Sequence, residues 1–249
     1  MRLKPFFSYY GSKHRIARLY PEPQTGRIID CCCGSAAYPL LHFRRKVLLT
    51  DANPRVAGVW DFLIRASVAE IRTLPVLANG EGVDALNVPQ EAKWLIGFNL
   101  ARGRAHPAKT PSAWRTDQWK SSHFWGEAIR ERIARQVPFI RHWKVRCANY
   151  WEAPDVEADW FFDPPYQGRA GRQYRRFGSD NFDYEAAGRW AQERRGQVIA
   201  CENVGATWLP FQPFRRATGM QGANRTGVSH EAIWHRPLYS TQQADLFAA

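Results

Sequence analysis

Short apolar runs that end in an acidic residue recur along the chain. Four such runs span residues 27–30, 47–51, 160–163 and 197–202. They are apolar on both faces and helical stretches separate them, which is typical of buried parallel strands in an α/β fold. Ligands bind at the carboxyl ends of such strands. We therefore expect a site where the terminal acids of these runs gather, namely Asp30, Asp51, Asp163 and Glu202.

The segment between the second and third runs has a different pattern. Residues 123–137 are expected to form a helix, because apolar residues recur there at four-residue spacing, at Trp125, Ile129, Ile133 and Val137. Residues 103–122 are rich in Gly, Pro, Ser and Thr and indicate a loop. We expect an inserted, mainly helical region at 65–146, between the two halves 1–64 and 147–238 of one α/β domain, and a flexible tail at 239–249.

The chain is strongly basic, with 35 Lys and Arg residues against 23 Asp and Glu residues, a net charge of +12. Residues 102–146 hold eleven of the basic residues and three of the acidic ones, which is +8 of that charge. Such an excess indicates a polyanionic partner, most often nucleic acid, while a solvated basic face is the alternative. The candidate contacts to DNA are Arg102, Arg104, Lys109, Arg115, Lys120, Arg169, Arg172, Arg175 and Arg176.

Composition excludes several classes of protein. A hydrophobic content of 45% with 14% aromatic residues excludes a disordered chain. No window approaches 18 consecutive apolar residues, so a membrane protein is not expected. The five cysteines include the consecutive Cys31, Cys32 and Cys33 and form no C-x-x-C pair. We expect a reduced, cytoplasmic protein without a metal site.

The tetrapeptide Asp163-Pro164-Pro165-Tyr166 carries the most specific chemistry in the chain. Two consecutive prolines fix the backbone in an extended form and leave carbonyl groups free to accept hydrogen bonds. An acid, a carbonyl and an aromatic face together suit an exocyclic amino group on a flat base. Asp163 and the Pro164 carbonyl can accept its two N–H bonds while Tyr166 stacks on the ring. The alternative is a simple turn at the end of a strand.

This tetrapeptide stands in a series of motifs that resembles the D12 class of DNA adenine-N6 methyltransferases, the Dam-like family, and its phage-type members in particular. The resemblance covers nearly the whole chain in order, at residues 6–13, 28–36, 50–53, 147–150, 163–166 and 199–203. The sequence departs from the family pattern where Cys31 and Cys32 replace Pro and Phe, and Ala36 and Ser12 replace Gly. Asn149 stands where the family has Asp.

The resemblance implies a Rossmann-like sheet that binds S-adenosylmethionine, with helices on both faces and residues 65–146 as target-recognition region. Lys13 and Asp30 would lie near the methionine part of the cofactor, Asp51 would bind the ribose, and Tyr150 would pack on the adenine. Asp51 follows Asp30 by 21 residues, the spacing expected of a ribose-binding acid. Helix capping is the alternative role for these two acids. The full implied cofactor set is Tyr10, Gly11, Lys13, Asp30, Gly34, Asp51, Asn53, Asn149, Tyr150 and Asp163.

The activity that the resemblance implies is direct, in-line transfer of a methyl group to N6 of an adenine flipped out of double-stranded DNA, without a metal ion. Transfer to cytosine N4 is an alternative, because that amine presents the same donors to the same tetrapeptide. A second alternative is a degenerate methyltransferase fold that binds DNA without chemistry. The expected setting is the cytoplasm of a bacterial or phage-infected cell, in association with the nucleoid.

The C-terminal residues contain one more motif. Gln243-Ala244-Asp245-Leu246-Phe247 resembles the Gln-x-x-Leu-Phe pentapeptide by which bacterial proteins bind the DNA polymerase sliding clamp. In a flexible tail, Leu246 and Phe247 can enter an apolar groove while Gln243 fixes the register. The alternative is that the two apolar residues fold back on the domain.

Overall fold

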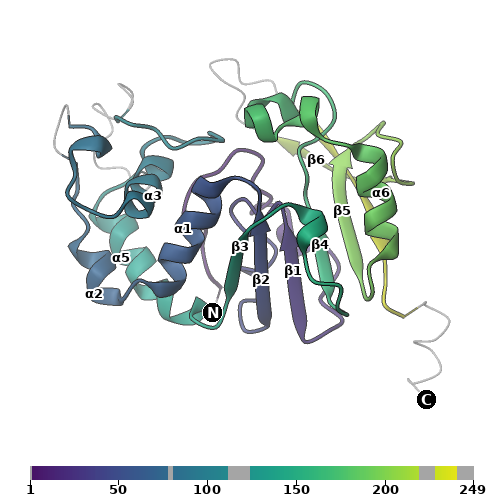
Figure 1. Cartoon of the computed structure of the whole chain (residues 1–249), viewed down its shortest axis with the longest axis horizontal. Helices are drawn as coiled ribbons and strands as arrows, with labels where there is room; N and C mark the ends of the chain where they lie inside the picture. Colours follow the sequence, from purple (N-terminus) through teal and green to yellow (C-terminus); the bar gives the residue numbers. More distant parts are fainter. Residues whose placement is uncertain (1, 78–80, 112–123, 219–227, 240–249) are drawn as a thin grey trace.

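The computed structural model describes residues 2–77, 81–111, 124–218 and 228–239. A mixed sheet with the strand order β3-β2-β1-β4-β5-β7-β6 runs through it (Figure 1). The strands β1 to β5 are parallel, and β7 is antiparallel to both β5 and β6. Their bounds are β1 Arg27–Cys31, β2 Lys46–Asp51, β3 Lys144–Cys147, β4 Asp159–Phe162, β5 Val198–Asn203, β6 Gln212–Thr218 and β7 Val228–Arg236.

The four apolar runs of the sequence form β1, β2, β4 and β5, so these predicted strands are confirmed. All four residues of β4 are buried, as a strand with both faces covered requires. The chain leaves β1 in one direction along the sheet to β2 and later returns on the other side to β4. This reversal between β1 and β4 is the switch point at which open α/β sheets bind ligands.

Helices cover both faces of the sheet, and the predicted α/β class is confirmed (Figure 1). One apolar core joins Ile28 and Phe161 of the sheet to helices α1, α3 and α5. The other joins Ile29 and Phe162 to Trp190 of α6, because successive strand residues point to opposite faces. The helices are α1 Pro54–Arg65, α2 Val68–Thr73, α3 Gln90–Leu100, α5 Glu127–Gln136 and α6 Tyr184–Glu193. Short 3-10 turns occupy 17–19, 83–85, 137–140, 150–152, 171–177 and 179–181.

The described part of the insertion between β2 and β3 is mainly helical, with α3 packed against α1 and α5 packed against α2 (Figure 1). The helix predicted at 123–137 is confirmed in kind, but α5 starts at Glu127, directly after the weak helix former Gly126. No helix or strand interrupts residues 103–111, and residues 112–123 of the predicted loop lie outside the described ranges. Lys144–Cys147, of which residues 144–146 fall within the predicted insertion, pairs with β2 as part of the sheet.

Three strands were not predicted: β3 at one edge, β6 at the other, and β7 beside β6. The antiparallel β7 places its residues against the carboxyl end of β5, with Glu231 opposite Asn203. Within the described ranges, no helix combines the length and apolar character that crossing a membrane requires.

Candidate functional site

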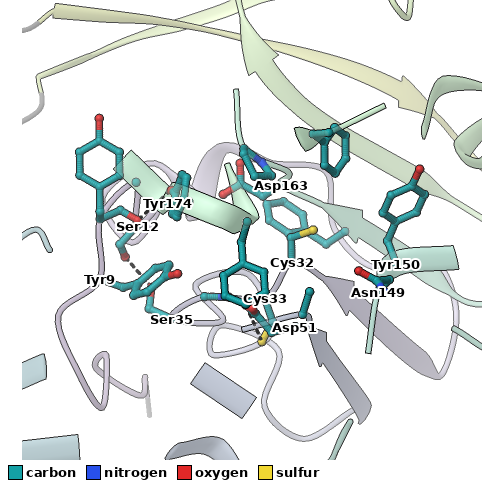
Figure 2. Close-up of a pocket in the computed structure, with 18 of the residues that line it drawn as sticks. Tyr9, Ser12, Cys32, Cys33, Ser35, Asp51, Asn149, Tyr150, Asp163 and Tyr174 are labelled. Carbon is teal, nitrogen blue, oxygen red and sulfur yellow. Dashed lines mark hydrogen bonds between the residues drawn. The ribbon is translucent and has the colours of Figure 1, made fainter. Parts of the chain in front are cut away.

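A cavity opens at the carboxyl ends of β1, β2 and β4, around the switch point (Figure 2). Its floor comes from the turn after β1, the end of β2 and the 149–151 turn after β3. Asp163 and Pro165 enter it from the end of β4. Residues 9–13 and the segment 174–183 complete the wall. The structure therefore brings the predicted cofactor motifs and the predicted catalytic tetrapeptide to one cavity.

The turn after β1 has a left-handed backbone at Cys32 (φ 60°), Gly34 (φ 46°) and Ala36 (φ 51°). A Cβ atom on Gly34 would lie 2.8 Å from the ring of Tyr9, so only glycine fits there. The Gly34 N–H donates to Asp51 Oδ2 at 3.0 Å and ties the turn to β2. Ala36 keeps the conformation that a glycine would favour, although it carries a side chain. Gly34 lines the cavity, and the Tyr9 ring fills the space beside its Cα.

Asp51 lies at the end of β2 and lines the cavity. Besides the bond from Gly34, its Oδ1 accepts a hydrogen bond from the Asn53 N–H at 2.9 Å. Burial raises the pKa of Asp51 to about 6, although the backbone donors of Asn53 and Gly34 oppose the shift. At neutral pH the side chain is therefore a carboxylate, fixed in position by the backbone and facing the cavity.

Two residues of the implied cofactor set do not line the cavity. Asn53 is the N-cap of α1, where its side chain accepts from the Arg55 N–H at 3.1 Å. Asp30 is fully buried beneath the site, and in the described part of the chain neither carboxyl oxygen has a hydrogen-bond partner. Burial, followed by the charges of Asp163 and Asp51, raises the pKa of Asp30 well above its ordinary value. The neutral acid is the form that this environment favours.

The N-terminal segment closes over the cavity through Tyr10, Gly11 and Lys13, three members of the implied cofactor set. A Cβ atom on Gly11 (φ 73°) would lie 2.5 Å from the hydroxyl of Tyr174. That hydroxyl donates to the Tyr10 carbonyl at 3.2 Å. This hydrogen bond therefore connects the segment after the tetrapeptide to the N-terminal segment across the cavity.

A buried cluster of charged groups surrounds Asp163. Lys13 Nζ lies 3.0 Å from Asp163 Oδ1 and 3.9 Å from Glu231 Oε2. It also lies 4.5 Å from the centre of the Tyr166 ring. Burial alone would lower the pKa of Lys13, but the carboxylates of Asp163 and Glu231 outweigh it and raise the pKa. Lys13 therefore remains an ammonium ion.

The same cluster acts on Asp163 in two opposite directions. Burial raises the pKa of Asp163 above its ordinary value, while the positive charge of Lys13 lowers it and the negative charge of Glu231 raises it. Lys13 thus favours the ionised acceptor against the cost of burial. Glu231 comes from β7, a strand that was not predicted, and sequence reasoning missed it.

Hydrogen bonds from outside the tetrapeptide also fix Pro165 and Tyr166. Tyr166 is buried, and its hydroxyl donates to Glu231 Oε2 at 2.5 Å. Pro165 lines the cavity and its carbonyl accepts from the Tyr184 hydroxyl at 2.8 Å, whereas Pro164 and Tyr166 do not line it. The predicted stacking face of Tyr166 is turned toward Lys13 in this structure.

Glu202, expected at the same edge of the sheet, does not line the cavity. Its carboxylate accepts from the Gln167 N–H at 3.1 Å, the Asn203 N–H at 2.8 Å and the Trp208 indole at 3.2 Å. The bond from Gln167 fixes the chain just after the tetrapeptide. Glu202 therefore supports the site from outside.

On the opposite wall, Asn149 and Tyr150 line the cavity as expected (Figure 2). The Asn149 N–H donates to Glu152 at 2.7 Å in a capping box that sets the 150–152 turn. The Tyr150 ring packs against Phe182 and Trp190, with ring centres 5.5 and 5.0 Å away. Aromatic and apolar cavity residues that sequence reasoning missed are Tyr9, Cys32, Cys33, Trp151, Phe177 and Phe182.

The predicted DNA-contacting residues occupy several environments. Arg176 lines the cavity, and Arg102, Arg104, Arg169 and Arg175 are exposed. Two others are exposed but paired with acids, Arg172 with Asp180 at 3.0 Å and Lys109 with Asp84 at 2.7 Å. Arg115, Lys120 and the predicted clamp-binding residues Gln243, Leu246 and Phe247 lie outside the described ranges.

Fold and geometry together define an α/β protein with a ligand cavity at the switch point of its parallel strands. Compared with models of known protein families and with curated proteins, the chain gives no match. Across the described ranges, no group of three or more His, Cys, Asp or Glu residues is arranged to hold a metal ion.

Proposed function

We propose that this protein is an S-adenosylmethionine-dependent DNA methyltransferase that modifies the exocyclic N6 of an adenine flipped out of double-stranded DNA, as its resemblance to the D12 class implies. One observation carries the proposal. The Gly34 turn and Asp51, which suit a nucleoside cofactor, share one cavity with Asp163 of the tetrapeptide, which suits an amino group.

The residues present fit the proposed cofactor. Gly34, which is buried, lines the cavity in the turn after β1, and ligands of doubly wound sheets approach at such a turn. Asp51 is held by backbone donors, and its Oδ1, which accepts the Asn53 N–H, retains a lone pair for a ribose hydroxyl. Tyr150 offers a buried aromatic face for the adenine. When bound, S-adenosylmethionine would supply an electrophilic methyl group.

Asp163 is the proposed acceptor for the target amine. The lone pair of an aromatic amine is delocalised into the ring, so the amine is a poor nucleophile. A hydrogen bond from its N–H to the Asp163 carboxylate favours a pyramidal nitrogen with a localised lone pair, and the carboxylate can take the proton that the nitrogen loses. Lys13 occupies Oδ1 at 3.0 Å, which leaves Oδ2 for the amine.

The base would enter between Asp163 and Tyr166. Lys13 Nζ lies 4.5 Å from the centre of the Tyr166 ring, so the base stacks there once Nζ has moved off the ring face while keeping its contact with Asp163. Flipping the base costs a few kcal/mol, which stacking and phosphate contacts offset. The arginines nearest the cavity, Arg176 within its wall and Arg169 and Arg175 on the same segment, are the proposed phosphate contacts.

The test is a methylation assay with base identification. The purified protein is incubated with S-adenosylmethionine and DNA from a host that lacks methyltransferases, and the digested nucleosides are separated by mass spectrometry. N6-methyladenine is expected. N4-methylcytosine would reassign the target base. No modified base, with binding of S-adenosylhomocysteine and DNA retained, would indicate a DNA-binding module instead.

Asp163→Ala tests the mechanism within that assay. We expect a loss of about 10²–10⁴-fold in kcat, the usual contribution of a positioned proton acceptor. The affinity for S-adenosylhomocysteine should stay within about threefold, since the Gly34 turn, Asp51 and Tyr150 supply the cofactor contacts that the geometry supports. Asp61→Ala, an exposed acid on α1, is the matched control. Full activity of Asp163→Ala would refute the proposed role.

A further inference from the structure

Glu231 is a buried acid that the fold brings near Asp163 from β7, which lies two strands from β4 in the sheet. It lies on β7, opposite Asn203 of β5 and Arg215 of β6. Its side chain is 7% exposed, and it does not line the cavity. Its role is therefore sought in the residues that it contacts.

Glu231 contacts two residues that themselves contact or neighbour Asp163. Its Oε2 accepts the Tyr166 hydroxyl at 2.5 Å and lies 3.9 Å from Lys13 Nζ. The same lysine lies 3.0 Å from Asp163 and 4.5 Å from the Tyr166 ring centre. One carboxylate thus restrains both the aromatic ring and the cation that define the position of the acceptor.

The charge balance of this cluster argues against a purely structural role. Two buried carboxylates share Lys13, and burying a second carboxylate has a large desolvation cost. An apolar side chain on β7 would pack against Tyr166 without that cost. Charged groups held in such a cluster beside a cavity are typical of functional sites.

We propose that Glu231 is a positioning residue that orients Tyr166 through its hydroxyl and holds Lys13 against Asp163, so that the target amine meets a fixed acceptor and a fixed ring. The proposal rests on the methyltransferase function proposed above. It adds a residue from outside every motif on which that function depends.

Steady-state kinetics of Glu231→Gln, Tyr166→Phe and the double variant test the proposal. Glutamine keeps the shape and an acceptor oxygen for Tyr166 but removes the charge. We expect kcat to fall about tenfold, with KM for S-adenosylmethionine and for DNA within about twofold, since an interaction that acts on positioning affects kcat. The two single losses should combine less than multiplicatively, because Glu231→Gln replaces the charged acceptor of the Tyr166 hydrogen bond by a neutral one and Tyr166→Phe removes its donor.

The matched control is Glu193→Gln, an acid of α6 whose side chain is 70% exposed. Unchanged kcat in Glu231→Gln, or losses that multiply in the double variant, would overturn the proposal. The proposal would also be overturned if the lower kcat of Glu231→Gln were fully explained by a lower melting temperature of the variant. Glu231→Asp keeps the charge and is expected to recover part of the lost kcat if the role is positional.

A second readout needs no turnover and separates this inference from the proposed function. Competitive labelling with acetic anhydride, followed by mass spectrometry, compares the reactivity of Lys13 with that of the exposed Lys144. Glu231→Gln should raise the labelling rate of Lys13 about threefold or more, because one of its two carboxylate partners is removed. The rate of Lys144 should not change. An unchanged Lys13 rate contradicts the inference even if methylation is found, and a raised rate supports it even if methylation is absent.

Discussion

Burial affects each acidic residue of the site differently, according to the donors that the fold supplies. Asp51 receives two backbone N–H groups, and Asp163 receives the ammonium group of Lys13. Asp30 is enclosed among apolar groups with the charges of the other two nearby, which favours its neutral form. Asp51 and Asp163 are therefore held in a fixed geometry at the cavity. The proposed function assigns the contacts with cofactor and target base to these two acids.

The first prediction concerns the pH dependence of cofactor binding. Burial raises the pKa of Asp51 to about 6, and the ribose hydroxyls are proposed to donate to its ionised form. The affinity for S-adenosylhomocysteine should therefore be constant above pH 7 and fall as the pH decreases through about 6, approaching tenfold per pH unit below it. Isothermal titration calorimetry between about pH 5 and 8 measures this.

Asp51→Asn is the control for that dependence. At about pH 7.5 we expect the affinity to be about 10–100-fold weaker, the cost of losing hydrogen bonds to a charged group. Since asparagine does not titrate, the decrease below pH 6 should disappear. The same decrease in the variant would assign the titration to another group and contradict the role of Asp51.

At the scale of elements, the sequence predicts the strands that are buried on both faces. β1, β2, β4 and β5 are continuous apolar runs, and such runs have few alternatives to a central strand. β3 and β6 are edge strands with mostly exposed or polar residues, and β6 includes Pro213. The positions of β3 and β6 depend on pairing between segments that are distant in the sequence. The local pattern of apolar and polar residues does not predict such pairing.

The same reason limits prediction of the site. Asp51, Asp163 and Gly34 follow directly from predicted strands, so their position at one edge of the sheet could be expected. Glu231 reaches Asp163 only because β7 runs antiparallel beside β5. Asn53 was placed with the cofactor by its motif, yet the helix that starts after it uses its side chain.

The prediction at this scale concerns the N-cap of α1. Asn53 accepts from the Arg55 N–H at 3.1 Å, so Asn53→Ala should lower the free energy of unfolding by about 1 kcal/mol. The affinity for S-adenosylhomocysteine should not change. Urea denaturation and calorimetry on the same variants measure both quantities.

Asn53→Ser keeps a capping oxygen and should recover most of the stability. If Asn53→Ala instead weakens cofactor binding with stability intact, the residue has the cofactor role that the family resemblance implies. The capping geometry would then be incidental.

At the scale of the whole molecule, the basic charge divides into two parts. Much of the charge in the insertion is used internally: Arg130, Arg132 and Arg141 donate to backbone carbonyls, and Arg135 pairs with Glu131. The exposed arginines at 102–104 and 169–176, which we call the rim arginines, lie on segments that contact the cavity residue Tyr10. Tyr10 joins them, because its N–H donates to the Arg104 carbonyl and its carbonyl accepts from Tyr174.

This division predicts which arginines determine the salt dependence of DNA binding. Removing one contact to a phosphate should reduce the slope of log affinity against log salt concentration by about 1. We expect that reduction for Arg104→Ala and for Arg175→Ala. Arg135→Ala removes the same charge from a side chain that is 73% exposed but paired on α5, and should leave the slope unchanged.

Fluorescence anisotropy of a labelled duplex, titrated at several salt concentrations, gives the slopes. Equal reductions in all three variants would mean that DNA contacts the basic surface without regard to the cavity. A reduction confined to Arg104→Ala and Arg175→Ala places the phosphate backbone along the rim, where a flipped base is within reach of Asp163. Contacts to phosphates fix the position of the protein on DNA, whereas contacts to bases determine which sequence is recognised. Substitution of the rim arginines should therefore weaken binding to all duplexes equally.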